Sequence, residues 1–442
     1  MEQLDIYNNL NEFIDWLKYD LEEQRKEIAK DRGISKDDVK EEELVLHIGD
    51  KNKDSDTIDL LNQQYTTYNI YFNLYIILSR LGNNIITDNN KSYQVCKYRI
   101  NARHCIFNSD FETYQVIFEK EINFFDSKFK NNKESFFSSC NFESSLIFYN
   151  CSFYTNFNFY NCLFLNEVNF EKSKFYSNIE FNGGDINDKI NLNNSFIQNN
   201  LVISCNTVNN INLDNISFDN SKSLLSIKNI TNAIESISLK DIYMNGRVNF
   251  YNIKIKNINL QGTNIIGDFS DIKCEYDNLS NWQTARILKH EEYKKSNTIK
   301  ALEYHAEETK LYKEKLLNKP NKTIKDFGDI LSISLSSIYS DNGLNWIKSI
   351  FMTILVTTIF FSIFYISNIF SSNYVFNEDY IYKLVEYFIP TKYDSLIEYA
   401  KNSNVYILKK ILCILVYFIG KIMVWYGSVQ TVQAFRKFSK KE

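Results

Sequence analysis

The 442-residue chain has only two prolines and 12 glycines, and it lacks several patterns that catalytic and metal-binding proteins carry. It contains no P-loop, no glycine-rich phosphate loop and no nucleophile–base arrangement. The eight cysteines include no C-x-x-C pair, and the four histidines have no paired spacing and no H-E-x-x-H motif. We therefore expect no catalytic activity, no metal site and no cofactor.

A strong charge imbalance is also missing. The chain has 50 Lys and Arg residues against 54 Asp and Glu residues, which gives a net charge of −4. This balance argues against a general nucleic-acid binder, although it allows a local basic groove. The first 30 residues are charged throughout, so we expect no signal peptide. Unpaired cysteines in such a chain suit a reducing compartment.

Large apolar residues repeat every 11 residues through the middle of the chain. The three columns are Phe137, Phe148, Phe159, Phe170, Phe181, Leu192 and Ile203; Phe142, Phe153, Phe164, Phe175, Ile186, Ile197 and Val208; and Leu146, Phe157, Val168, Ile179, Ile190 and Leu201. Two residues before the second column the side chains are small: Cys140, Cys151, Cys162, Ser173, Gly184 and Ser195. A strand would give a period of two and a helix a period of 3.6, so the pattern predicts a solenoid.

The 11-residue unit divides into five plus six, and downstream the period becomes five, as in Phe250, Ile255, Leu260 and Ile265. Pieces such as C-N-F-E-S, C-S-F-Y-T and C-L-F-L-N resemble degenerate pentapeptide repeats over about residues 105–272. The resemblance implies a right-handed quadrilateral β-helix. With four faces, a coil needs about 22 residues, which stacks Cys140 on Cys162 roughly 4.8 Å apart. Asn suits the corners. Residues 219–236 break the register, and we expect a bulge or an inserted loop there.

Two apolar stretches near the end of the chain indicate a membrane protein. Residues 349–370 contain no charge over 22 positions, which is enough to cross a bilayer core of roughly 30 Å. A second stretch runs from about Val405 to Val429 and is interrupted by Lys409, Lys410 and Lys421. We predict two transmembrane helices. Basic residues flank both spans on one side, and the loop 371–404 has three lysines against five acids, which places both termini and the solenoid in the cytoplasm.

These segments predict a mixed fold of four parts. Residues 1–100 form a helical N-terminal domain, with an amphipathic helix over 1–30 and a Tyr-rich helix over 57–81 that cap the open end of the solenoid. Residues 101–275 form the β-solenoid. Residues 276–345 form a cytoplasmic helical connector, with a helical stretch over 279–317 that Pro320 stops. Residues 346–442 form a two-helix transmembrane domain with an external loop 371–404 and a basic tail.

Several pieces of the second half resemble bacterial pentapeptide-repeat membrane proteins over about residues 280–440. They include A-L-E-Y-H-A-E-E, Y-S-D-N-G-L-N-W, F-I-P-T-K-Y-D and V-Q-T-V-Q-A-F-R-K-F. This resemblance implies an architecture in the bacterial inner membrane and little of the mechanism. The layout also resembles membrane effectors of anti-phage defence, including one type that a DNA oligomer holds shut.

Three groups of polar residues are candidate sites. Lys421, with Ser428 and Thr431, is either a pore-lining residue or a lysine that extends to the lipid headgroups. Gln430, Gln433 and Arg436 are candidates for a cytoplasmic gate or simply a polar helix end. The third group, Lys289, Lys294, Lys295 and Lys300, is expected to meet anionic lipid or an anionic ligand such as an oligonucleotide. For His290 and His305 a solvated charged face is favoured over a metal site.

We therefore expect a homo-oligomeric pore whose cytosolic solenoid senses a ligand or a regulatory protein partner and controls opening, as in abortive infection by membrane disruption. The first alternative is a membrane-anchored scaffold for protein partners that transports nothing. A second alternative, a mimic of duplex DNA, needs a long acidic face, whereas this solenoid mixes Lys with Glu and Asp. The pore and the scaffold differ in whether Lys421 faces an oligomer axis.

Overall fold

The computed structural model describes residues 6–48, 66–68, 72–82, 85–88, 91–131, 133–218, 222–368, 378–389, 391–402 and 407–439. It contains two compact units, Met1–Ser280 and Asn281–Glu442. The helices are α1 (Leu10–Arg32), α2 (Leu74–Leu81), α3 (Trp282–Lys294), α4 (Thr298–Leu317), α5 (Ile324–Ser340), α6 (Trp346–Asn368), α7 (Glu378–Phe388), α8 (Asp394–Asn402) and α9 (Ile407–Ser439). Two short 3-10 turns span Lys36–Asp38 and Glu41–Glu43.

The first unit is a parallel β-solenoid of about eight turns whose strands form four ladders. The first ladder contains β1 (Ile6–Tyr7), β3 (Thr66–Tyr68), β8 (Cys105–Phe107), β12 (Lys128–Phe129), β16 (Ser152–Phe153), β20 (Lys174–Phe175), β23 (Phe196–Ile197), β26 (Ser217–Phe218), β29 (Tyr243–Met244) and β31 (Asn264–Ile265). The second contains β4 (Phe72–Asn73), β9 (Phe111–Tyr114), β13 (Ser135–Ser138), β17 (Phe157–Tyr160), β21 (Ile179–Asn182), β24 (Asn200–Ser204), β27 (Leu224–Lys228), β30 (Arg247–Asn259) and β32 (Phe269–Leu279).

The other two ladders share their later strands, because these strands are long enough to turn a corner. The third ladder begins with β6 (Lys91–Cys96), β10 (Val116–Phe118), β14 (Asn141–Phe142) and β18 (Leu163–Phe164), and the fourth begins with β2 (Val45–His47), β7 (Arg99–Asn101), β11 (Ile122–Asn123), β15 (Leu146–Ile147) and β19 (Val168–Asn169). Both ladders continue through β22 (Asp185–Asn191), β25 (Thr207–Asn212), β28 (Ala233–Ser238), β30 and β32. One antiparallel strand, β5 (Ile85–Asp88), pairs with β6. Four strands to a coil confirm the predicted four-sided cross-section.

The interior is a set of aromatic stacks in which each phenylalanine lies on its counterpart in the next coil. Phe153 pairs with Phe175 across β16 and β20, 22 residues later, as predicted. Their ring centroids are 4.7 Å apart and nearly parallel. Phe148 and Phe170 stack at 4.8 Å. The spacing matches the distance between hydrogen-bonded strands, so the aromatic column and the backbone ladder reinforce each other.

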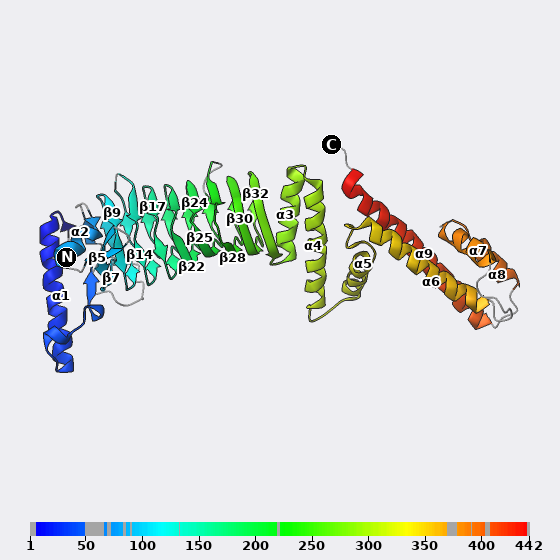
Figure 1. Ribbon diagram of the computed structural model, residues 1–442, viewed down its shortest axis with the longest axis horizontal. Helices are drawn as coiled ribbons and strands as arrows, with labels where there is room; N and C mark the ends of the chain where they lie inside the picture. The colour runs from blue at the N-terminus through cyan, green and yellow to red at the C-terminus, as the bar shows by residue number, and fades with distance from the viewer. Residues whose placement is uncertain are drawn as a thin grey trace. The chain divides into compact units, whose positions relative to one another are not determined.

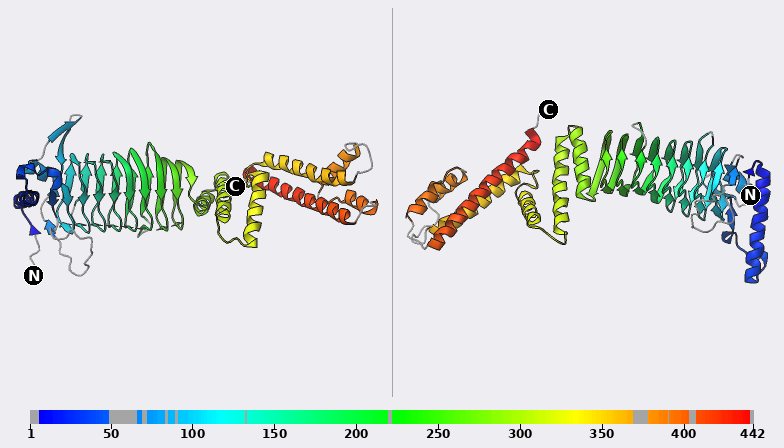
Figure 2. Two further views of the ribbon diagram at one scale, coloured as in Figure 1. Left: turned by 90° about the horizontal axis from the view of Figure 1, so that it is seen from below. Right: turned by 180° about the vertical axis from the view of Figure 1, so that it is seen from behind.

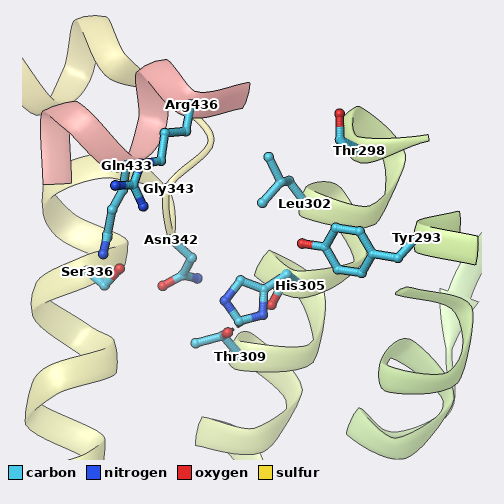
Figure 3. Close-up of a pocket in the computed structure, with 10 residues that line it drawn as sticks. All are labelled: Tyr293, Thr298, Leu302, His305, Thr309, Ser336, Asn342, Gly343, Gln433 and Arg436. Carbon is cyan, nitrogen blue, oxygen red and sulfur yellow. Dashed lines mark hydrogen bonds between the residues drawn. The ribbon is translucent and has the colours of Figure 1, made fainter. Parts of the chain in front are cut away.

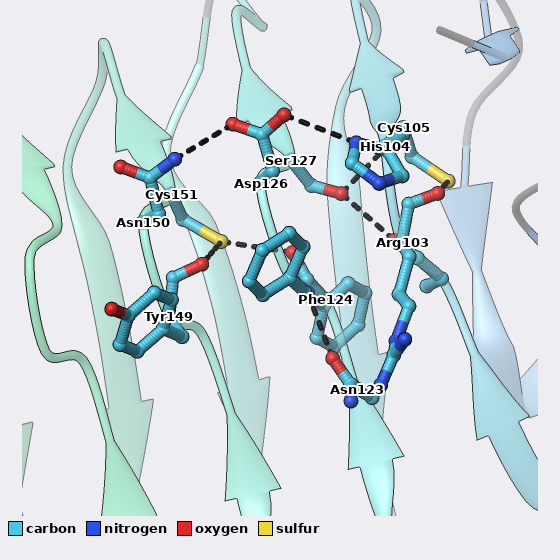
Figure 4. Close-up of polar contacts among 12 residues, drawn as sticks. Arg103, His104, Cys105, Asn123, Phe124, Asp126, Ser127, Tyr149, Asn150 and Cys151 are labelled. Carbon is cyan, nitrogen blue, oxygen red and sulfur yellow. Dashed lines mark hydrogen bonds and ion pairs between the residues drawn. The ribbon is translucent and has the colours of Figure 1, made fainter. Parts of the chain in front are cut away.

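The corners of the coils use left-handed backbone, as predicted for Asn. One corner column contains His104, Asp126 and Asn150, each with a φ between 53° and 58°. Figure 4 shows the Asp126 carboxylate accepting hydrogen bonds from His104 Nδ1 and Asn150 Nδ2, both at 3.0 Å. Asn and Asp tolerate this conformation better than other non-glycine residues. The polar corner side chains therefore stack from coil to coil outside the aromatic core.

The small residues before the second column occupy a position where the neighbouring coil leaves no room. Cys140 and Cys162 stand in register between β14 and β18, as predicted, and both are buried. A Cβ atom added to Gly184 would lie 2.0 Å from the backbone oxygen of Cys162. Burial and the neighbouring Cys162 thiol raise the pKa of Cys140 well above its usual value. The described cysteines are free thiols that pack as small apolar side chains.

Residues 219–236 break the regular 22-residue spacing, as predicted, because extra residues lie in this stretch; residues 219–221 are outside the described part. Within the described part, β27 and β28 continue their ladders, and Leu201 pairs with Leu225, two residues more than a regular coil. The extra residues lie between strands. The one register shift in these ladders falls earlier, between Ile186 and Lys189 of β22.

The predicted helix over 57–81 is confirmed only in its last part, as α2, and is wrong for the described residues before it. Residues 66–68 and 72–73 are strands of the solenoid, and only α2 is helical; residues 57–65 and 69–71 lie outside the described part. Asn73 accepts a hydrogen bond from the amide of Ile76 and caps α2, and left-handed Gly82 ends it. The solenoid therefore begins well before residue 101. The predicted helix at 1–30 is confirmed from residue 10 as α1, whereas residues 6–7 form strand β1 and residues 1–5 lie outside the described part. Phe13 of α1 packs edge-on against Tyr68 at 5.1 Å and covers the first coil.

The described part of the second unit consists of two helical pairs, the helix α5 between them, and the two short helices α7 and α8. Figures 1 and 2 show α3 beside α4 and α6 beside α9. The stretch predicted as helical over 279–317 is divided into α3 and α4 by a turn at residues 295–297, with Ser296 in left-handed backbone. Asn297 caps α4 and Pro320 follows its end. Figure 2 shows α5 running across the α6–α9 pair and not along it.

Candidate functional site

The α3–α4 pair is fastened by one buried carboxylate. Glu308 of α4 accepts hydrogen bonds from Arg286 Nε at 2.7 Å and from Lys289 Nζ at 2.5 Å. Burial alone would raise the pKa of the Glu308 carboxyl, but the two cations outweigh it and lower this pKa below its usual value. The pair therefore stays ionised at neutral pH and holds α3 against α4.

The four lysines predicted to bind lipid or an anionic ligand have partners inside the α3–α4 pair. Lys294 and Lys295 bind Glu291 and Glu292, each at 2.8 Å, and both carboxylates are buried. Lys300 lies over the ring of Tyr304 at 5.7 Å. Of these contacts, only the one from Lys289 to Glu308 joins α3 to α4; the others lie within α3 and its cap or within α4.

Helix α5 begins at a capping box formed by Thr323 and Asp326. The hydrogen bond from Lys319 at 2.7 Å, with those from Thr323, lowers the pKa of Asp326 to about 2. Beyond this start, α5 exposes an apolar face made of Ile324, Phe327, Leu331 and Ile338, the first of which is 92% exposed. Their spacings of three, four and seven place them on one side of the helix.

Helices α6 and α9 pack through small and polar residues while their apolar residues face outward. Gly427 approaches so closely that an added Cβ would lie 2.1 Å from Thr353 Oγ1. Ser349 is fully buried and its Oγ is 3.0 Å from Thr431 Oγ1. The exposed large apolar residues of the pair are Ile347, Ile350, Phe351, Ile354, Leu355, Ile359, Ile363, Ile366, Ile407, Leu408, Ile411, Leu412, Leu415, Phe418, Ile419, Ile422, Trp425, Val429, Val432 and Phe435. This is the reverse of the pattern in a soluble helix pair.

Of the described residues, one helix is long and apolar enough to cross a membrane, over Trp346–Ile366. This segment coincides with the first predicted span. The second predicted span, about Val405–Val429, lies in α9, a continuous helix of 33 residues that does not meet the same measure. Residues 403–406 and 369–377, at the edges of these predictions, lie outside the described part.

Lys421 is turned into the second unit and is only 2% exposed. Its ammonium donates hydrogen bonds to the backbone oxygens of Tyr387 at 2.9 Å and Ile389 at 2.8 Å, at the end of α7. It also lies 4.7 Å from the ring centroid of Tyr387 and 5.7 Å from that of Tyr417. A cation suits the C-terminal end of a helix and the face of an aromatic ring. In the single chain the Lys421 ammonium is therefore buried against the end of α7. It is neither exposed nor placed at an end of α9.

The other predicted pore-lining and gate residues separate into three environments. Ser428 is exposed and donates to Val424 O within its own helix, whereas Thr431 lies against Ser349. Gln430 is buried, and its Oε1 accepts hydrogen bonds from Ser340 at 2.6 Å and Ser336 at 3.2 Å. These bonds join α9 to α5. Gln433 and Arg436 are exposed on the next turns of α9.

A pocket of about 370 Å³ lies where α3, α4, α5 and α9 meet, and Gln433 and Arg436 line it. Figure 3 shows these two side chains on the α9 side, with His305 and Thr309 on the α4 side. Ser336 and Asn342 contribute from the end of α5 and the turn that follows. Two of the three predicted gate residues thus meet in a pocket that sequence reasoning did not find, because its other walls come from segments about 100 residues earlier in the chain.

A tyrosine cluster around Lys421 was also missed. Tyr380 and Tyr387 of α7, Tyr399 of α8 and Tyr417 of α9 are buried with Phe361 and Phe364 of α6. The tyrosines of α7 and α8 fall in the segment predicted to be an external loop, where nothing in the residue spacing indicates a packed core. The comparisons with protein-family models, curated proteins and solved structures find no match for this chain.

Proposed function

We propose that this chain is a two-span membrane protein of the pentapeptide-repeat type that forms a homo-oligomeric pore under the control of its cytosolic solenoid. The α6–α9 pair carries the proposal. Its outward surface is apolar along both helices, and its interface contains Ser349, Thr353, Gly427 and Thr431. Small residues that let backbones approach, with apolar side chains outside, are typical of helices packed in lipid. Lys421, the one charged residue that is buried in the described part of α6 and α9, has carbonyl and aromatic partners, as an intramembrane lysine requires.

Helix α5 supports this placement because it suits the surface of a bilayer. It runs across the α6–α9 pair and contacts α9 through Ser336 and Ser340, while Phe327 and Leu331 lie on the exposed apolar face. Exposed Lys325 lies beside that face. An amphipathic helix with apolar residues on one side and lysine near the headgroups binds anionic interfaces. In our proposal α5 lies in the cytoplasmic interface, at the base of the spans.

This placement is tested with a spin label at Leu331 of the full-length chain in liposomes, in a Cys274→Ser background that leaves only buried cysteines. We expect the label on Leu331→Cys to collide more often with oxygen than with a water-soluble nickel complex, because the acyl chains surround it. The control Asp329→Cys, on another side of the same helix, should show the reverse. A label on Ile354→Cys reports separately on whether α6 lies in lipid.

Low accessibility of Leu331→Cys to both reagents would instead indicate a protein contact, such as a second copy of the chain. Preferential collision with nickel would show that the face lies in water. If Ile354→Cys also collided mainly with nickel, the membrane placement of α6 itself would be wrong.

Control of the pore is proposed to act through Gln430, since this residue joins the helix that spans the membrane to the helix that lies across it. Two neutral hydrogen bonds of this kind contribute roughly 1–3 kcal/mol in total. The bonds would hold the closed arrangement, and a ligand or partner sensed by the solenoid would release them. Cell damage by an opened pore is the output that we propose, as in anti-phage defence.

The function is tested by ion flux through the full-length protein in liposomes. Gln430→Leu should raise flux about tenfold or more over the wild type, because losing about 1.4 kcal/mol from the closed state shifts the equilibrium tenfold. The control Thr358→Leu likewise replaces a polar side chain of the α6–α9 pair with leucine, at a partly exposed position where the hydroxyl donates to Ile354 O of its own helix. It should conduct like the wild type.

A membrane-anchored scaffold is the second candidate, and one observation favours it. Lys421 is turned toward Tyr387 and Ile389 of its own chain, so it is not presented to neighbouring copies. Absence of flux from every variant, together with a monomeric chain in detergent, would support the scaffold over the pore.

A further inference from the structure

We propose that the pocket between α3, α4, α5 and α9 is a binding site for a phosphate-bearing ligand of nucleotide size. The volume of about 370 Å³ lies within the range of roughly 300–1,000 Å³ that small-molecule sites occupy. The proposal does not depend on whether the chain conducts ions. It concerns a part of the second unit that the pore proposal leaves without a role.

The lining favours an anion. Arg436 contributes a guanidinium and His305 an imidazole, and no Asp or Glu is among the described residues that line the pocket. Arg436 has no ion-pair or hydrogen-bond partner in the described part of the chain. The nearest carboxylate to His305 is Glu308, 3.6 Å from its Nδ1, and Arg286 and Lys289 already neutralise it. A planar guanidinium with free N–H groups is well suited to bidentate contact with phosphate oxygens.

A second feature favours a ligand that carries a hydrogen-bond donor. The Oδ1 atom of Asn342 is buried and accepts no hydrogen bond within the described residues. Asn342 is held in left-handed backbone, with a φ of 57°, in the turn after α5, so its position is fixed by the chain. An acceptor without a partner is costly unless a ligand or water donates to it. A ligand with an N–H or O–H group a few ångströms from its phosphate would supply that bond.

The aromatic ring of Tyr293 lines the pocket on the α3 side. Aromatic rings stack on nucleobases, and every base offers a flat face for this contact. Phosphate, a hydrogen-bond donor and a flat ring are combined in a nucleotide. A phospholipid with an amino headgroup shares the phosphate and the donor but not the ring, and we commit to the phosphate chemistry common to both.

The binding test uses the full-length protein in nanodiscs of zwitterionic lipid, titrated calorimetrically with adenosine and guanosine monophosphates and with inorganic phosphate. We expect a nucleotide to bind more tightly than phosphate. Arg436→Gln should weaken binding at least tenfold, since a lost charge-assisted contact contributes about 1.5–3 kcal/mol and 1.4 kcal/mol is tenfold. Asn342→Asp places a carboxylate beside the phosphate and should weaken binding at least as much, while left-handed backbone tolerates Asp.

The matched control is Lys325→Gln, which removes one positive charge from exposed α5 and should leave binding within twofold. A parallel arm measures retention of an anionic amino-phospholipid by native mass spectrometry in the wild type and in Arg436→Gln. Retention that depends on Arg436, without nucleotide binding, identifies the lipid as the source of the phosphate. The proposal is overturned if neither arm shows binding, or if Arg436→Gln and Lys325→Gln weaken it equally.

Discussion

Replacing Lys421 with alanine should lower the free energy of unfolding of the full-length protein by about 2–4 kcal/mol, because one buried and one part-buried carbonyl lose their donor. The oxygens of Tyr387 and Ile389 accept from this ammonium at 2.9 and 2.8 Å. The contacts with the Tyr387 and Tyr417 rings are lost as well, at about 0.5–2 kcal/mol. Removing the buried charge itself offsets part of this loss. Thermal unfolding in detergent, with hydrogen exchange of α7, measures the effect.

Lys410→Ala is the matched control, because it removes the same residue type from the same helix. Lys410 donates to the Ala400 oxygen at 2.6 Å in an exposed position, so the change should cost at most about 0.5 kcal/mol. Hydrogen exchange should rise in α7 for Lys421→Ala alone. A stable Lys421→Ala protein with altered ion selectivity would show instead that Lys421 lines a pore.

Replacing Phe148 with alanine should cost about 3–5 kcal/mol, which is the usual loss for a buried phenylalanine. Phe148 is fully buried and stacks on Phe124 and Phe170, both at 4.8 Å. Because each coil contacts only its neighbours, the loss should concentrate in the adjacent coils. Hydrogen exchange of the full-length protein, read strand by strand, locates it.

Phe136→Ala provides the comparison, since Phe136 follows buried Ser135 on the outward side of β13 and meets Tyr160 edge-on at 6.2 Å. Its removal should cost about 1 kcal/mol, because the side chain is only partly buried and one aromatic pair is lost. Equal costs for the two variants would contradict a core built on the Phe148 column.

The solenoid could be predicted because residues that contact each other in adjacent coils are separated by a nearly constant number of residues in the sequence. Residues such as Phe153 and Phe175 meet because they are one coil apart, so the spacing in the sequence encodes the contact directly. Spacing gives no prediction where a segment is apolar but its apolar residues do not recur at a fixed interval. The stretch before Asn73 has residues suited to either helix or strand, and pairing with β8 and β9 decides for strand. Likewise, extra residues between strands shift the spacing around Leu225 without breaking the ladder.

The candidate site was much less predictable. The composition of α6 indicated a span, but the partners of Lys421 lie 34 and 32 residues earlier, in a segment without a periodic signal. Gln430, Gln433 and Arg436 were recognised as polar residues at a helix end. Their separation into one residue bound to α5 and two in a pocket depends on how α4 and α5 fold back. Likewise, the contacts of Lys294 and Lys295 depend on the neighbouring acids Glu291 and Glu292 of α3.

The nearest-neighbour construction of the solenoid has a consequence for biosynthesis. Each coil can close as soon as the following 22 or so residues have emerged, without waiting for the rest of the chain. Residues 280–345 separate the last strand from α6, and translation at roughly 5–20 residues per second takes roughly 3–13 s to cover them. Small all-β domains fold within milliseconds to seconds. In the two-span arrangement proposed above, the solenoid can therefore fold before α6 leaves the ribosome, and a folded solenoid would not pass through a membrane. The order of synthesis itself would keep it on the side where it was made.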